Sequence, residues 1–156
     1  MKISGTVCGE SGMLQLGEML AKFISAGDLV FLNGDLGAGK TTLSRGFLRA
    51  LGYVGTVNSP TYAMVETYEL ESLLCHHFDG YRIKSADEWL DMGLDDYLAP
   101  DAVCLIEWPD SGESILPKPT WVIDISIPAA SDSRYVSVTT TKDHIINKEQ
   151  LQACFS

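Results

Sequence analysis

The sequence predicts an α/β fold, in which a sheet flanked by helices forms a single domain over residues 1–156 and carries an antiparallel hairpin insertion. Three observations support this prediction. An apolar run at residues 29–32 leads into the glycine-rich stretch "GDLGAGKTT", and an amphipathic helical pattern follows it. A second apolar run, "AVCLIE", ends in a carboxylate, as buried central strands often do. Between these runs lie two strand-like segments separated by a short turn. Together they indicate a P-loop NTPase-like sheet.

The first elements along the chain are a strand and a helix. Residues 2–8, "KISGTVC", form the expected strand. From Ser11 onward, apolar side chains recur on one helical face, at Met13, Leu16, Leu20, Phe23 and Ile24. After the glycine-rich loop, helical spacing returns at Leu43, Phe47, Leu48 and Leu51. Gly52 is expected to end this second helix.

The middle of the chain predicts a loop, a hairpin and a helix. Pro60 favours an extended conformation for the preceding residue, so Ser59 and Thr61 are expected on a loop. "TYAMVETYEL" and "SLLCHHFDGY" predict the hairpin strands. His76 and His77 then point to opposite faces, which we interpret as one core and one surface residue. "SADEWLDMGLDDYLAP" predicts one acidic helix, capped by Ser85 and ended by Pro100.

The last third of the chain predicts two paired strands and a short helix. "TWVIDISI" alternates, which places four apolar side chains on one face: Trp121, Ile123, Ile125 and Ile127. "RYVSVTT" is expected to pair with this strand. A short helix is expected in the tail that begins at Asp143.

Composition limits the possible partners and the compartment. The chain has 46% hydrophobic residues, a mean hydropathy of +0.07 and a formal charge of -10, which fit a soluble globular protein. This charge argues against a large contact with nucleic-acid phosphates, so any role near RNA is expected to run through a partner protein. No apolar run is long enough to cross a membrane, and the N-terminus has no signal core, which predicts a cytoplasmic protein. The four cysteines form no C-x-x-C pair, so we expect neither zinc nor disulfides.

The glycine-rich stretch fits the phosphate-loop pattern G-x-x-x-x-G-K-[ST] at Gly34, Gly39, Lys40 and Thr41. Backbone N–H groups in such a loop and at the start of the next helix bind nucleotide phosphates, the lysine adds a charge, and the threonine hydroxyl is a Mg2+ ligand. The expected nucleotide-binding residues are Asp35, Leu36, Gly37, Ala38, Gly39, Lys40, Thr41 and Thr42. ATP is favoured over GTP because no N-K-x-D element for guanine occurs in the sequence.

Three further residues are candidates for catalysis. Glu107 ends an apolar strand, which is where Walker B acids hold Mg2+, and the alternative is a solvated carboxylate at a strand end. Asp79 ends the second hairpin strand, where it can act near Mg2+ or position water, or serve as an ordinary turn residue beside Gly80. Thr61 lies on a loop that can reach a γ-phosphate, as switch segments do, or is a turn hydroxyl beside Pro60.

The order and spacing of "LGEMLA", "GDLGAGKTT", "SPTY", "HHFDGYRI" and "LIEWPD" resemble those of the bacterial TsaE (YjeE) ATPases of tRNA threonylcarbamoyladenosine synthesis. The resemblance covers about the first two thirds of the chain. It implies a small α/β fold and an Mg2+-dependent ATPase that supports an assembly of TsaB and TsaD, with tRNA reached only through these partners. It also implies that Lys40 and Thr41 bind nucleotide and Mg2+, that Thr61 is a switch contact, and that Asp79 and Glu107 lie near Mg2+ and the γ-phosphate. Met13 departs from the family, which often has a threonine there.

Two other functions compete with a partner-coupled ATPase. A small-molecule kinase shares the loop and the size, but such kinases use several cations beyond the loop, and here only Arg82 and Arg134 are arginines beyond the loop helix. A nucleotide-gated binding module, in which ATP occupancy alone changes partner affinity, has the same sequence features.

Overall fold

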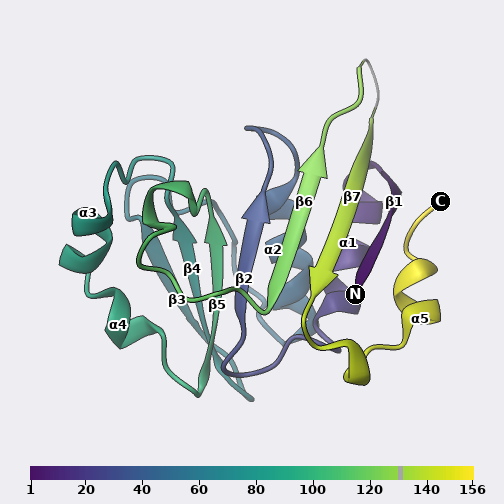
Figure 1. The fold of residues 1–156 in the computed structure, drawn as a ribbon. Coiled ribbons are helices and arrows are strands. Elements are labelled where there is room, and N and C mark those ends of the chain that lie inside the picture. The colour runs from purple at the N-terminus through teal and green to yellow at the C-terminus, as the bar shows by residue number, and fades with distance from the viewer. Residues whose placement is uncertain (130–131) are drawn as a thin grey trace.

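The computed structural model describes residues 1–129 and 132–156 of the chain. Its centre is one mixed sheet of seven strands in the order β1-β7-β6-β2-β5-β4-β3 (Figure 1). The strands are β1 (Lys2–Cys8), β2 (Leu29–Asn33), β3 (Val65–Glu69), β4 (Leu74–Asp79), β5 (Ala102–Glu107), β6 (Trp121–Ser126) and β7 (Ser133–Thr140). The predicted α/β architecture is confirmed.

Four neighbouring strands run parallel, and this determines where functional side chains can meet. β6, β2, β5 and β4 are parallel, whereas β7 and β3 pair antiparallel at the two sides of this group. The predicted hairpin of β3 and β4 is present, and because β4 also pairs with β5, the hairpin continues the main sheet. The carboxyl ends of β2, β5 and β4 therefore lie side by side at one edge.

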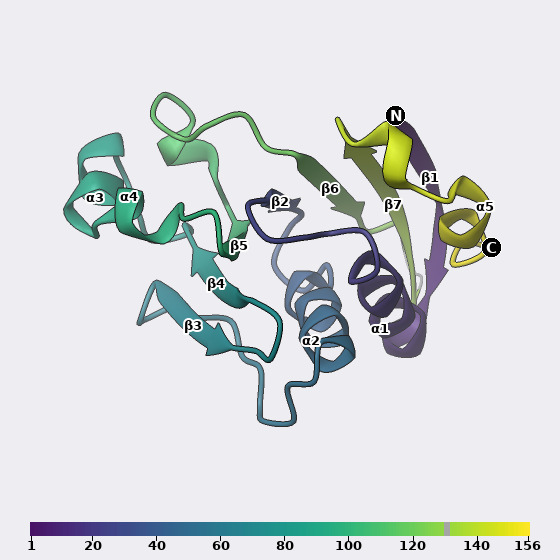
Figure 2. The same ribbon diagram turned by 90° about the horizontal axis from the view of Figure 1, so that it is seen from below.

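Helices α1 (Gly9–Leu20) and α2 (Lys40–Ala50) cover one face of the sheet, as Figure 2 shows. Their buried apolar side chains form a core with strand residues such as Val30, Leu32 and Ile123. The two helices cross closely at two glycines. A Cβ atom added at Gly17 would lie 2.1 Å from the carbonyl oxygen of Leu43, and one at Gly46 would lie 2.2 Å from that of Leu14.

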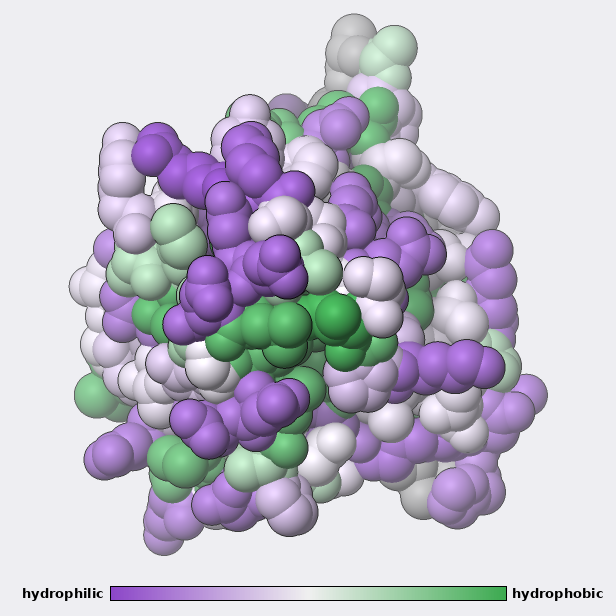
Figure 3. All heavy atoms as spheres, turned by 60° about the vertical axis from the view of Figure 1, so that its left-hand side comes forward, coloured by the Kyte–Doolittle hydropathy of each residue, from purple (hydrophilic) through white to green (hydrophobic). Residues whose placement is uncertain are grey.

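The opposite face of β4 and β5 is covered by α3 (Ala86–Asp91) and α4 (Leu94–Tyr97). The prediction of one continuous helix here is wrong, because Gly93 adopts a left-handed conformation with φ of 79° and separates two short helices. Ser85 caps the first of them as expected, accepting a hydrogen bond from the N–H of Glu88. On this side of the molecule hydrophilic residues surround a strip of apolar surface (Figure 3).

The C-terminal elements largely follow the predictions. β6 and β7 pair antiparallel, and Trp121, Ile123 and Ile125 are buried. Ile127 lies beyond the end of β6 and is 43% exposed, so the prediction that the alternating strand continues to this residue is wrong. The tail forms a 3-10 turn (Asp143–Ile145) and the short helix α5 (Lys148–Gln152), which packs beside β1. No helix within the described ranges is long and apolar enough to span a bilayer.

Candidate nucleotide-binding site

The glycine-rich loop connects β2 to α2 at the edge where the parallel strands end. Gly37 and Gly39 adopt left-handed conformations, with φ of 81° and 115°, which glycine adopts without steric cost. Gly39 is the N-cap of α2, and the helix begins at Lys40. The unpaired N–H groups of this helix start give the loop a positive partial charge that suits an anion.

The ammonium of Lys40 lies between the loop and an aromatic ring. Its Nζ donates a hydrogen bond to the carbonyl oxygen of Gly34 and lies 4.0 Å from the centre of the Trp108 ring. Burial lowers the pKa of the Lys40 ammonium, while the charges of Glu107 and Asp79 act in the opposite direction. Trp108 has a φ of 54°, an unusual backbone conformation for a bulky residue. The loop, the lysine and the indole therefore form one packed unit.

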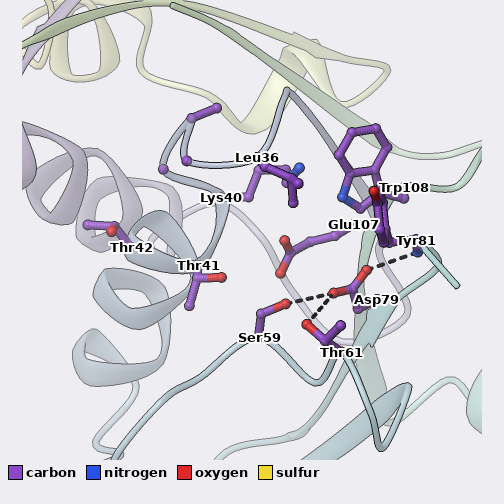
Figure 4. Close-up of a pocket in the computed structure, with 13 residues that line it drawn as sticks. Leu36, Lys40, Thr41, Thr42, Ser59, Thr61, Asp79, Tyr81, Glu107 and Trp108 are labelled. Atoms are coloured by element: carbon purple, nitrogen blue, oxygen red, sulfur yellow. Dashed lines mark hydrogen bonds between the residues drawn. The ribbon is translucent and has the colours of Figure 1, made fainter.

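Asp79 and Glu107 end neighbouring parallel strands and are paired in register. Both carboxylates are almost fully buried, with 4% and 3% of each residue exposed. The N–H of Gly80 donates to the carbonyl oxygen of Glu107 at 2.8 Å, which joins the two strand ends. Two carboxylates thus lie close together at low exposure, and they face the glycine-rich loop across a shared cavity (Figure 4).

The Asp79 carboxylate is held by three donors. Its Oδ2 accepts hydrogen bonds from the hydroxyls of Ser59, at 2.8 Å, and Thr61, at 3.2 Å. Its Oδ1 accepts one from the N–H of Tyr81 at 2.9 Å. The "SPTY" loop is therefore fastened to the end of β4 through this acid, and Figure 4 shows both hydroxyls directed at it.

Glu107 is held differently. Its Oε2 lies 2.5 Å from Nε2 of His77, a fully buried residue on the same strand as Asp79. The prediction that one of the paired histidines is a surface residue is wrong, since His76 is also buried, against Tyr97 on the other face. Their predicted opposite directions are present, but helices or loops cover both faces of β4.

The cavity between these groups has a volume of about 430 Å3. Most of the predicted site residues line it, namely Leu36, Gly37, Ala38, Gly39, Lys40, Thr41, Thr42, Thr61, Asp79 and Glu107. Asp35 lies in the same loop but is not part of the cavity wall. The wall also contains three residues that were not predicted as site residues: Ser59, Tyr81 and Trp108.

A second hollow of about 350 Å3 lies along the other flank of the loop, lined by Gly9, Glu10, Met13, Gly37, Ala38, Gly39, Thr42, Asp132 and Arg134. Arg134, on β7, donates from Nε to the carbonyl oxygen of Ala38 at 3.1 Å. It also donates from Nη2 to that of Gly37 at 3.4 Å. This contact could not be predicted from sequence motifs, because no local signal connects the arginine to a loop almost a hundred positions earlier.

The donor set fits a metal that is shared with a nucleotide. Among the described residues no group of three or more histidines, cysteines or acids is arranged to hold a metal by itself. Mg2+ commonly takes one or two protein oxygens and completes its shell with water and substrate phosphates. The Thr41 hydroxyl and the buried carboxylates across the cavity match this requirement.

Comparisons with known proteins give one consistent result. The family model described as "Threonylcarbamoyl adenosine biosynthesis protein TsaE" matches residues 8–136. The TsaE protein of Haemophilus influenzae is 43% identical over 121 residues, covering 74% of this chain and 77% of that protein. That of Bacillus subtilis is 40% identical over 124 residues, covering 80% and 77%. The crystal structure of B. subtilis YdiB superposes with a TM-score of 0.77 at 30% identity, over 97% of this chain and 91% of the other.

Proposed function

Because the chain belongs to the TsaE family, we propose that it binds and hydrolyses Mg2+·ATP in support of a TsaB–TsaD assembly that makes threonylcarbamoyladenosine on tRNA. One observation carries the ATPase part of this proposal: the phosphate loop faces two buried carboxylates, on adjacent strand ends, across one cavity. A loop that only bound nucleotide would not require this pair of acids.

The residues divide between binding and chemistry. The loop N–H groups and Lys40 bind the β- and γ-phosphates, and Thr41 with Glu107 holds Mg2+, which neutralises charge on those phosphates. Asp79 and Glu107 are the candidates for orienting the attacking water. Thr61 donates to Asp79 in this structure, so contact with a γ-phosphate requires its hydroxyl to change partner. This exchange gives the "SPTY" loop a way to distinguish ATP from ADP.

The second hollow provides space for the rest of the nucleotide. It lies on the other flank of the same loop residues, Gly37 to Gly39, and therefore continues the phosphate site on the side away from the acids. Met13 lines it and packs against Gly39, so this chain offers an apolar contact where relatives of this family often have a hydroxyl.

The arginines favour an ATPase over a small-molecule kinase. Arg82 stacks on the ring of Tyr62, with 4.4 Å from its Cζ to the ring centre, and Arg134 is directed at loop carbonyls. Neither side chain lines the cavity beside the acids. A kinase needs cations there to bind a second substrate and to stabilise the transferring phosphoryl group.

Partner proteins are needed for contact with tRNA. Its net charge of -10 opposes direct binding of tRNA, so we propose that tRNA is contacted by TsaB and TsaD. We further propose that this complex forms in the cytoplasm.

Reconstitution tests the proposal. Phosphate release and threonylcarbamoyladenosine formation are measured with TsaB, TsaD, tRNA and an activated threonylcarbamoyl donor, in ATP and in a non-hydrolysable analogue. We expect both products in ATP and sustained synthesis only when ATP is cleaved. Full synthesis in the analogue would instead identify a nucleotide-gated binding module, and phosphate transfer to an added small acceptor would identify a kinase.

A further inference from the structure

His77 lies directly behind the candidate catalytic acids. It is on β4, two residues before Asp79, so its side chain leaves the same face of the strand. The residue is fully buried, and its Nε2 lies 2.5 Å from Oε2 of Glu107. The imidazole therefore contacts an acid of the cavity wall without lining the cavity itself.

The surroundings of the ring indicate where its proton lies. Nδ1 is buried and has no hydrogen-bond partner among the described residues. A proton on Nδ1 would be a buried donor without an acceptor, which costs about 1–3 kcal/mol. Nε2 faces a carboxylate oxygen, which is an acceptor. We therefore place a proton on Nε2, which donates to Oε2 of Glu107.

The two acids differ in how their positions are fixed. Asp79 has a short side chain and accepts three hydrogen bonds. Glu107 has one more rotatable bond, and the hydrogen bond that the described structure gives its carboxylate is the one from His77. Without that donor the Glu107 carboxylate would be free to change rotamer inside the site, whereas Asp79 would stay in place.

We propose that His77 is a positioning residue: its Nε2–H fixes the Glu107 carboxylate through Oε2 and leaves Oε1 available for the chemistry of the site. This inference rests on the proposed ATPase function and deepens it. Groups that orient a ligand from behind commonly change activity by about 10–100-fold when they are removed.

Two substitutions separate positioning from packing. His77→Leu fills a similar volume without a donor, while His77→Gln brings an amide N–H close to the place of Nε2. We expect kcat for ATP hydrolysis to fall by about tenfold or more in His77→Leu with KM changed less than about threefold, and the glutamine variant to keep most of the activity. ADP affinity measured without Mg2+ does not require Glu107 in this scheme and should stay at the wild-type value in both.

His76 supplies the matched control. It is the adjacent buried histidine, its side chain leaves the opposite face of β4, and its Nδ1 hydrogen-bonds the hydroxyl of Thr67 on β3. His76→Leu should lower the melting temperature but leave kcat within about threefold of wild type. If His77→Leu is unfolded, His77→Asn replaces it, because the asparagine amide is one bond shorter than that of glutamine and does not reach Glu107.

Measuring Glu107→Gln in parallel separates failure of this inference from failure of the proposed function. Positioning predicts that adding His77→Leu to Glu107→Gln slows turnover little further, since both changes remove one interaction. Three results would overturn the positioning role alone. In the first, Glu107→Gln is slow while His77→Leu turns over at the wild-type rate. In the others, the effects of the two substitutions are additive, or His77→Leu and His77→Gln lose equal activity. A wild-type protein that hydrolyses no ATP, even with its partners, would overturn the function and this inference with it.

Discussion

The ammonium of Lys40 is the charge that the loop offers to a nucleotide. Hydrogen bonds to charged groups contribute about 1.5–3 kcal/mol, so Lys40→Ala should weaken Mg2+·ATP binding by roughly ten- to a hundredfold. Isothermal titration calorimetry measures this change. Lys118→Ala is the control, because Lys118 is exposed and lines a hollow beside Pro100 and Thr120, outside the nucleotide cavity. Equal affinities for the two variants would remove Lys40 from the nucleotide site.

Substitution of either acid should slow turnover without weakening nucleotide binding. Glu107→Gln and Asp79→Asn each remove a negative charge beside the phosphates, so we expect ATP binding to persist or tighten while kcat falls by about tenfold or more. Asp79→Asn should have the larger structural effect, since one carboxylate oxygen that accepts hydrogen bonds becomes an amide. Binding by calorimetry and phosphate release are measured on the same samples. Turnover at the wild-type rate would return these acids to a structural role.

Individual side-chain contacts in the site were harder to predict than the site residues themselves. The motifs singled out the loop, both acids and Thr61, which line one cavity, because each belongs to a local pattern at a strand end or turn. His77 and Arg134 were missed since their contacts depend on strands that neighbour each other only in the folded sheet. The left-handed backbone of Trp108, which places its ring over Lys40, likewise has no signal in the sequence.

The "SPTY" loop is expected to act as a nucleotide sensor. Thr61→Ala removes the hydroxyl that can change from Asp79 to a γ-phosphate, so the variant should lose part of the preference for ATP over ADP and retain ADP affinity. Ser59→Ala removes the other hydroxyl on the same oxygen of Asp79 and serves as the comparison. Affinities for both nucleotides are measured by calorimetry. An unchanged ratio in Thr61→Ala would show that the loop does not sense the γ-phosphate.

The contact between α1 and α2 supports the phosphate loop from behind. Gly17→Ala places a methyl group 2.1 Å from a backbone oxygen of α2, which must force the helices apart, and overpacking of this kind costs about 1–3 kcal/mol. We expect a lower melting temperature and weaker ATP binding, because α2 carries the loop. Gly12→Ala, also in α1, meets a side-chain methyl of Val7 at 3.0 Å and its backbone carbon at 3.8 Å, so that only the methyl has to shift and a smaller loss is expected. Equal melting temperatures for the two variants would contradict this packing argument.

Most elements were predictable from the sequence, and the errors share a physical cause. Periodicity identified the strands and both long helices, since their apolar faces are continuous. It missed the break at Gly93, where the pattern of apolar residues continues across a change in backbone direction. It also extended β6 to Ile127, because alternation does not show where pairing with a neighbouring strand stops.

Strand order assembles the site from distant parts of the chain. Residues 36–42, 59, 61, 79 and 107 line one cavity because β2, β5 and β4 are adjacent and parallel, an order that was not predicted from the sequence. The apolar run ahead of Glu107 indicated a central strand, but nothing local showed that β4 would lie beside it. The pairing of Asp79 with Glu107 is thus a property of the whole sheet.

The final prediction concerns the partners. Among the residues that the structure describes, the cavity wall has a phosphate loop and two acids but no arginine for a second substrate. Hydrolysis therefore has an evident use only if it changes the state of another protein. We expect slow turnover by the isolated chain and faster turnover when TsaB–TsaD is added. Complex formation should depend on nucleotide, because the "SPTY" loop is fastened to Asp79 until a γ-phosphate competes for Thr61.

ATPase rate and complex formation are measured with and without TsaB–TsaD, in ATP, in ADP and without nucleotide. Thr61→Ala tests the coupling: it should bind the partners equally well in ATP and ADP. Rapid turnover alone, with no binding to TsaB–TsaD in any nucleotide state, would contradict the coupling and leave an ATPase that acts without these partners.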